Sequence, residues 1–169
     1  MQSEPMIDLV VPSEWNRIDA VRSVTDHVMH AVARVAPTEF ARSLGMVASE
    51  LMENAVKYGK EGEDVSFRMQ QQGPSMLISV TNMSDPTRSP PSRLHARVAW
   101  LASFETALEA YRASIGKLDE DDTVGGAGLG LARILFEGEC TLHCQLHDDG
   151  RVSMEARHVW DSQPEPNPQ

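Results

Sequence analysis

The sequence predicts an α+β fold, a two-layer sandwich in which helices cover one face of a mainly antiparallel mixed sheet. Apolar residues recur every third or fourth position in the long segments, as in helices, and at every second position in the short ones, as in strands. Helices and strands come in groups rather than in strict alternation, which favours α+β. With 169 residues, 41% of them hydrophobic, the chain has the size and composition of one domain. We predict a single domain over residues 1–161 and a disordered tail over 162–169.

The chain is acidic, with a formal net charge of -10. A nucleic acid or an anionic membrane surface requires a basic patch, so the charge argues against both as partners. No apolar run approaches the roughly 20 residues of a membrane-spanning helix. The first residues also lack the basic and apolar regions of a signal peptide. We therefore expect a cytoplasmic protein with no membrane partner.

The first half of the chain predicts a strand, two helices and a pair of strands. A short apolar run at 7–11 ends at Pro12, and helical spacing then continues until Pro37 stops it. A second helix ends at Gly59, a residue suited to a left-handed C-terminal stop. Alternating patterns at 65–69 and 77–82 indicate two strands joined near Gly73-Pro74.

The second half predicts a helical insert, a glycine-rich turn with a short helix, and a hairpin. Residues 84–92 form a loop by composition. One helix, carrying the apolar residues from Leu94 to Ile115, follows within an insert at about 86–124. The glycine-rich stretch 125–131 opens a helix that ends at Phe136. Asp148-Asp149-Gly150 is a strong turn signal between the last two strands.

The strand before that turn contains two cysteines and two histidines, which suggest a metal site at first sight. In a strand Cys140 and Cys144 point to one face, and His143 and His147 point to the other, so the four side chains do not converge. The two cysteines are also about 13 Å apart along a strand, too far for a disulfide. We expect the two histidines and Gln145 to lie on the exposed face of the sheet.

A carboxylate and a carboxamide lie side by side on the second helix. The apolar stripe of this helix consists of Leu44, Val47, Leu51, Ala55 and Tyr58. Glu50 and Asn54 are four residues apart on the flank of that stripe. Polar groups at the edge of a buried face are costly unless something pairs with them. The pair is either an ordinary solvated flank, since charged pairs at this spacing are common, or part of a binding site.

The second informative stretch is Gly125-Gly126-Ala127-Gly128-Leu129-Gly130-Leu131. Glycines let the backbone approach a ligand closely, and a helix N-terminus offers N–H groups and a favourable dipole to a phosphate. The stretch is not a Walker loop, because no Gly-Lys-Ser/Thr follows, and it lacks the glycine spacing of a dinucleotide fingerprint. Taken alone, it is either a phosphate cradle or a turn that lets the helix pack.

Taken together, the two stretches resemble the GHKL ATPase/kinase superfamily, which has the Bergerat fold. The segment from Glu50 to Gly59 resembles its asparagine box, and Gly126 to Leu131 resembles its second glycine box. The similarity spans about residues 38–158. With neither a second domain nor a phosphoacceptor-histidine module, the chain is most similar to the small anti-sigma-factor-like serine/threonine kinases of partner-switching systems.

This resemblance implies a role for each matching residue. Asn54 would give its side-chain oxygen to a Mg2+ ion that bridges the phosphates of ATP. Glu50 would be the general base and accept a proton from the attacking hydroxyl. Lys57 would meet a phosphate, and Asp85 to Asp122 would form the lid. The phosphate-binding turn would consist of Gly126, Gly128, Leu129 and Gly130.

The sequence departs from the superfamily at its first glycine box. The superfamily has an aspartate at the end of a strand, which accepts a hydrogen bond from the adenine amine, followed by alternating glycines. Here the strand ends in Asn82, and Ser84 and Pro86 occupy the glycine positions. The Asn82 oxygen can still accept that bond, without the charge that makes such bonds about twice as strong. Asp85 is an alternative acceptor.

The resemblance implies an ATP- and Mg2+-dependent serine/threonine protein kinase. Its substrate would be a hydroxyl on a small antagonist protein, and its inhibitory target would be a sigma factor or another switch protein. The altered first glycine box leaves a second hypothesis open, a non-catalytic partner-switching module with weak or no ATP binding. ATP hydrolysis without a protein substrate is a third, and the sequence does not decide whether the chain forms a homodimer.

Overall fold

The computed structural model describes residues 5–32, 38–118 and 129–159. Gly125, Gly126, Gly128, the acidic run 119–122 and the predicted tail lie outside these ranges. The elements are β1 (Ile7–Pro12), α1 (Trp15–Val32), α2 (Thr38–Tyr58), β2 (Asp64–Gln72), β3 (Ser75–Met83), α3 (Pro91–Ala102), α4 (Ala107–Leu118), α5 (Leu129–Phe136), β4 (Cys140–Leu146) and β5 (Arg151–Val159).

The five strands form one sheet in the order β1-β2-β3-β5-β4. The α+β prediction is confirmed, but the sheet differs from the expected mixed one, because all four pairings of the described strands are antiparallel. Short turns join β2 to β3 and β4 to β5, which makes those pairs antiparallel. Between β1 and β2 the chain forms two helices, so it re-enters the sheet in the opposite direction.

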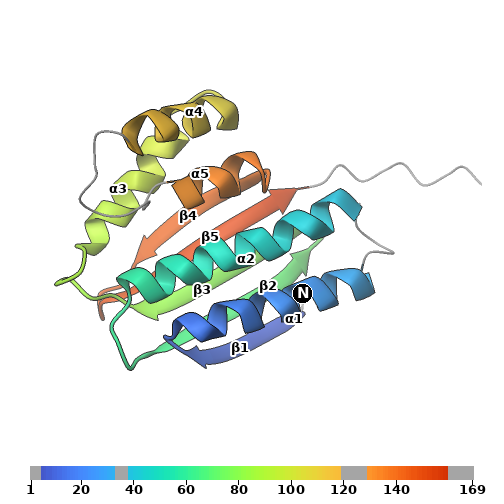
Figure 1. Ribbon diagram of the computed structural model, residues 1–169, viewed down its shortest axis with the longest axis horizontal. Helices are drawn as coiled ribbons and strands as arrows, with labels where there is room; N and C mark the ends of the chain where they lie inside the picture. The colour runs from blue at the N-terminus through green and yellow to red at the C-terminus, as the bar shows by residue number, and fades with distance from the viewer. Residues whose placement is uncertain (1–4, 33–37, 119–128, 160–169) are drawn as a thin grey trace, which may run out of the picture.

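The helices cover one face of the sheet, as Figure 1 shows for α1, α2 and α5. The strand burial follows this arrangement: in β5 every second residue is buried, including Met154, which faces the core. On β4, Cys140 and Cys144 are buried thiols, whereas His143 and Gln145 are exposed, as expected for the open face. His147, expected to be exposed beside them, lies after the end of β4 and is partly buried, with its ring 2.8 Å from Ser153 Oγ. Burial raises the pKa of Cys140 to about 12 and that of Cys144 to about 11.

The insert contains two helices, so the prediction of one continuous helix is wrong. The chain leaves α3 after Ala102, and α4 starts with a reciprocal cap. The Glu109 backbone N–H donates to Thr106 Oγ1, and the Thr106 N–H donates to the Glu109 carboxylate, both at 3.2 Å. This capping box begins a new helix. Because the helix is broken, Leu101 is buried, while Leu108 and Ile115 are 38% and 47% exposed.

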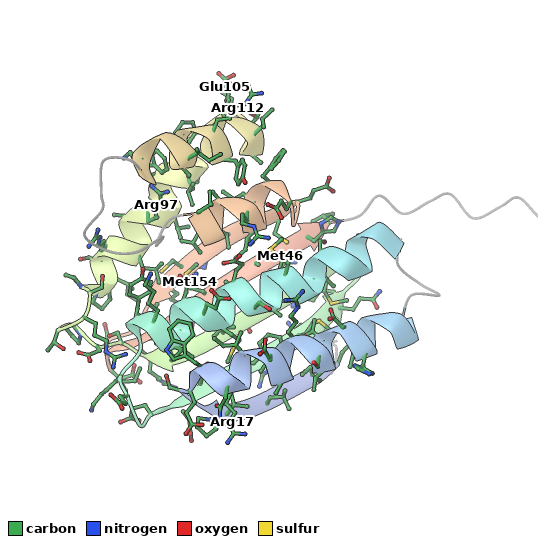
Figure 2. The ribbon with its side chains drawn as sticks, viewed as in Figure 1. Arg17, Met46, Arg97, Glu105, Arg112 and Met154 are labelled. Atoms are coloured by element: carbon green, nitrogen blue, oxygen red, sulfur yellow. The ribbon has the colours of Figure 1, made fainter. Side chains whose placement is uncertain are left out.

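The two insert helices extend the helical layer towards one edge of the sheet. α3 packs against the edge strand β4, and α4 packs against α5. Tyr111 of α4 stacks on Phe136 of α5, with ring centroids 5.2 Å apart. Figure 2 shows Glu105 and Arg112 on the outer side of this region, away from the sheet. None of the helices in the described ranges is long and apolar enough to cross a membrane.

Candidate functional site

The helix α2 combines core packing with three polar side chains along one flank. Its apolar stripe is buried as predicted at Leu44, Val47, Leu51 and Ala55, each exposed by 4% or less, whereas Tyr58 is partly buried. Glu50, Asn54 and Lys57 are separated by four and three residues, so helix geometry brings them to one side. All three are partly buried, and the Glu50 side chain is only 14% exposed. A carboxylate in this position requires a partner.

The beginning of α5 lies directly against Glu50. A Cβ atom added to Gly130 would collide with the Glu50 carboxylate oxygen Oε2, so only glycine allows this approach without a shift. Gly138 has the same role just beyond the other end of α5, where a Cβ would meet Val47 of α2. Two residues that the sequence analysis assigned to one site, Glu50 and Gly130, are therefore adjacent in the structure.

The partner of Glu50 is Arg133 on α5. Arg133 Nη1 donates to Glu50 Oε1 at 2.6 Å, across 83 residues of sequence. The same guanidinium donates from Nε and Nη2 to the two oxygens of Glu137, at 3.0 and 3.1 Å. Arg133 thus bridges two carboxylates. Neither Arg133 nor Glu137 was predicted from the sequence, because the asparagine and glycine boxes contain neither residue.

The local environment raises the pKa of Glu50 above its ordinary value. Burial is the largest cause, because it penalises the charged form; the negative charges of Glu53 and Glu137 act in the same direction. Arg133 lowers this pKa through its charge and its hydrogen bond, without cancelling the effect of burial. A carboxylate with a raised pKa is a stronger base than an exposed one, and this property favours general-base catalysis.

The end of β3 lies beside the C-terminal end of α2. A Cβ on Gly59 would lie 3.0 Å from Asn82 Nδ2, and Gly59 pairs with Ser84 in an isolated antiparallel bridge. Asn82 Nδ2 donates to the Met83 carbonyl at 3.0 Å. Ser84 Oγ donates to the Gly150 carbonyl at 2.7 Å. Gly59 is nine residues from Glu50, which corresponds to about 14 Å along the helix axis.

The Asp85 carboxylate forms hydrogen bonds and an ion pair within its own loop. Its Oδ1 accepts hydrogen bonds from the Thr87 backbone at 3.0 Å and from the Thr87 hydroxyl at 2.6 Å. Its Oδ2 lies 3.5 Å from Arg88 Nε. These hydrogen bonds from Thr87, the larger influence, and the Arg88 charge lower the pKa of Asp85. The loop is also tied to α2, because the Asp85 N–H donates to the Tyr58 carbonyl at 3.0 Å.

Of the remaining predicted site residues, Leu129 and Lys57 lie within the described ranges and two glycines do not. Gly126 and Gly128 lie outside the described residues. Leu129 is the first residue of α5 and, like Gly130, is partly buried. The Lys57 ammonium lies 5.5 Å from the centroid of the Tyr58 ring. The flank of α2 and the start of α5 therefore meet at Glu50 and Gly130, while Asn82 and Asp85 lie near the C-terminal end of α2.

A magnesium ion at this site would need oxygen ligands from outside the protein. In the described ranges, no three His, Cys, Asp or Glu side chains are grouped as a metal site. Mg2+ usually takes one or two protein oxygens and completes its octahedron with phosphate oxygens and water. The Asn54 carboxamide, one helical turn after Glu50, could supply such an oxygen. The donor set fits an ion that arrives with a nucleotide.

Comparison with known proteins supports the fold and leaves the family open. No family model matches the chain, and no curated protein matches it either. A chain in the crystal structure of the SiaB-SiaC complex from Pseudomonas aeruginosa has a similar structure, with a TM-score of 0.65. The match covers 94% of this chain and 92% of that one, at 19% sequence identity. At this identity the similarity establishes a common fold and nothing more specific.

Proposed function

We propose that this protein is an ATP- and Mg2+-dependent serine/threonine protein kinase of the anti-sigma-factor type, acting by partner switching. The observation that carries the proposal is the contact between the Glu50 carboxylate and Gly130. The sequence analysis assigned these two residues, 80 positions apart, to one phosphoryl-transfer site, and the helices that carry them pack against each other at that point. A glycine in the first turn of α5 that served packing alone would not need to face a carboxylate whose pKa is raised.

The proposed reaction transfers the γ-phosphoryl group of ATP to a serine or threonine hydroxyl of a small antagonist protein. Glu50 accepts the hydroxyl proton as the oxygen–phosphorus bond forms and the bond to the β-phosphate oxygen breaks, which leaves ADP. The N-terminal end of α5 attracts the phosphates through its N–H groups and dipole. When bound, Mg2+ would neutralise phosphate charge. Asn54 would hold this ion, and Lys57 would add a positive charge beside the phosphates.

A titration with ATP and Mg2+ tests the nucleotide part of the proposal. We expect binding that depends on Mg2+ and is weakened at least tenfold by Asn54→Ala, because the ion loses its protein ligand. Glu53→Gln is the matched control, since Glu53 is the exposed neighbour on the same helix. If the parent and Asn54→Ala bind ATP and Mg2+ with equal affinity, the assigned role of Asn54 is contradicted.

A second candidate function is a non-catalytic module that binds a partner protein without needing ATP. The observation that favours it is the hydrogen bonding near Asn82: Asn82, Ser84 and Asp85 each bond to neighbouring protein groups. The similar solved structure is that of a protein–protein complex, which supports a protein partner under either candidate. Complete absence of ATP binding, together with a folded protein, would select the second candidate.

A further inference from the structure

We infer that Arg133, anchored by Glu137, is a positioning residue that fixes the Glu50 carboxylate at the start of α5. The inference deepens the proposed function and rests on it for the catalytic consequence. Arg133 would not touch the nucleotide or the substrate in this role. It would act through Glu50, by holding one carboxylate oxygen so that the other points in a defined direction.

The geometry of the guanidinium gives each contact a separate function. Arg133 uses Nε and Nη2 for Glu137, and Nη1 remains for Glu50 Oε1. Because the guanidinium is planar and rigid, the two-point contact with Glu137 sets the direction of Nη1. Glu50 Oε2 then lies against Gly130 at the first turn of α5. The two oxygens of Glu50 therefore have different environments, one paired and the other beside the proposed phosphate site.

An ordinary surface ion pair would not support this inference. The pair between Arg133 in α5 and Glu137, the residue after the end of α5, is an i,i+4 pair with side chains 37% and 39% exposed, and such pairs contribute little to stability. The contact with Glu50 is different, because Glu50 is 14% exposed and belongs to another helix. In this contact a partly buried carboxylate, Glu50, is held by Arg133, and Glu137 fixes the orientation of Arg133.

The charges that act on Glu50 give the inference a distinctive signature. Arg133 acts on it from α5, Glu137 from the position after the end of α5, and Glu53 from the same helix as Glu50. Tyr111 of α4 influences Arg133 in turn. Loss of the Arg133 charge should raise the pKa of Glu50, because Arg133 lowers it. Loss of the Glu137 charge should lower that pKa, because Glu137 raises it. Two variants, one in α5 and one at the residue after its end, thus have opposite expected effects on the pKa of Glu50.

The test is a carbon-detected NMR titration of the glutamate carboxyl groups in the full chain. Glu50 is assigned from the signal lost in Glu50→Gln. Arg133→Gln should shift the Glu50 titration to higher pH, and Glu137→Gln should shift it to lower pH. Arg68→Gln is the matched control, because Arg68 forms a 2.8 Å pair with Asp8 at the far edge of the sheet. It should leave the Glu50 titration unchanged.

Arg133→Lys separates orientation from charge. Lysine keeps the positive charge but lacks the rigid fork, so the Glu50 titration should stay near that of the parent. ATP turnover should nevertheless fall about 10- to 100-fold, since small misplacements of a reacting group have effects of this size. Arg133→Gln should lose at least as much and should shift the acidic limb of the pH–rate profile upwards. If Arg133→Gln does not fold, Arg133→Lys and Glu137→Gln still provide the test.

Two results would overturn the inference. One is a Glu50 titration that does not move in Arg133→Gln, which means that Arg133 does not control Glu50. The other is faster turnover in Arg133→Gln or Arg133→Lys, which means that the contact inhibits Glu50. A parent protein that binds no ATP would instead refute the proposed function. The NMR titration separates these failures, because it reports on the contact between Arg133 and Glu50 without any nucleotide.

Discussion

The two ends of the candidate site are built differently. Where α2 meets α5, Glu50 and Arg133 are held by contacts between segments 83 residues apart, and Gly130 leaves room for the carboxylate. At the C-terminal end of α2, Asn82 donates to the carbonyl of the next residue, and Asp85 accepts from Thr87 two residues later. The first region, which we name the α2–α5 contact, depends on tertiary packing. The second, which we name the β3 end, has local side-chain hydrogen bonds at Asn82 and Asp85, and longer-range bonds join it to Gly150 and to the Tyr58 carbonyl.

This difference indicates which region is specialised for chemistry. A partly buried carboxylate with a raised pKa costs stability, and folded chains tend to keep such groups where they have a function. The short-range hydrogen bonds at the β3 end are typical of turns. Under the proposed function, the α2–α5 contact would carry the chemistry, and the β3 end would contribute less to it.

The largest expected effect is that of Glu50→Gln. Loss of the general base should lower ATP turnover about 10²- to 10⁴-fold, as is typical of such residues, while ATP binding stays close to that of the parent. Turnover is followed as labelled phosphate released or transferred to protein. Glu105→Gln, which removes an exposed carboxylate outside the site in the same way, should have little effect. Undiminished turnover in Glu50→Gln would remove Glu50 from the mechanism.

Gly130→Ala tests the close packing at the α2–α5 contact. The new Cβ meets the end of the Glu50 side chain, which can rotate away, so we expect a displaced carboxylate in a folded protein. Turnover should fall about 10- to 100-fold. The control is Gly116→Ala in α4, where an added Cβ meets nothing within 4 Å. That variant should be as active as the parent and more stable by about 0.5–1 kcal/mol in urea unfolding.

Asn82→Asp tests the β3 end by restoring a charged acceptor. A charge-assisted hydrogen bond to the adenine amine should increase the preference for ATP over GTP by about tenfold. The aspartate cannot donate to the Met83 carbonyl, so a loss of about 1 kcal/mol in stability should accompany the gain. Parallel calorimetric titrations with ATP and GTP measure the preference. An unchanged ratio would mean that Asn82 does not face the base.

The pH dependence of stability gives the smallest expected effect. Because the pKa of Glu50 is raised in the folded state, its contribution favours folding fully below the unfolded value of about 4.5 and is lost as the pH rises through the folded value. Glutamine resembles the protonated form. The melting temperature of Glu50→Gln should therefore exceed that of the parent slightly at pH 7, and the difference should shrink towards pH 4. A difference that grows on acidification would have the wrong sign.

The sequence predicted those features that depend on periodicity and local signals. The apolar stripe of α2, the hairpins and the exposed face of β4 all follow from spacings of two, three or four residues. The break between α3 and α4 was also encoded locally, because Thr106 and Glu109 have the spacing of a capping box. The continuous apolar pattern from Leu94 to Ile115 concealed it.

The contact between Arg133 and Glu50 could not be predicted in the same way. It depends on how closely α5 approaches α2, and that distance is set by packing at Gly130 and Gly138. Sequence spacing indicates which residues share a helix face, but it does not indicate which residue of another helix will face them. Arg133 was recognisable only as an i,i+4 partner of Glu137.

The central claim is that the phosphates of ATP, rather than its adenosine, provide most of the binding at this site. The most direct test measures the affinity for each part separately. The parent protein is titrated calorimetrically with ATP, inorganic triphosphate and adenosine, each with Mg2+. If the α2–α5 contact defines the site, triphosphate should bind within about tenfold of ATP, and adenosine should bind far more weakly, because phosphate contacts contribute most of the affinity. Adenosine binding as tightly as ATP, with no binding of triphosphate, would contradict the account.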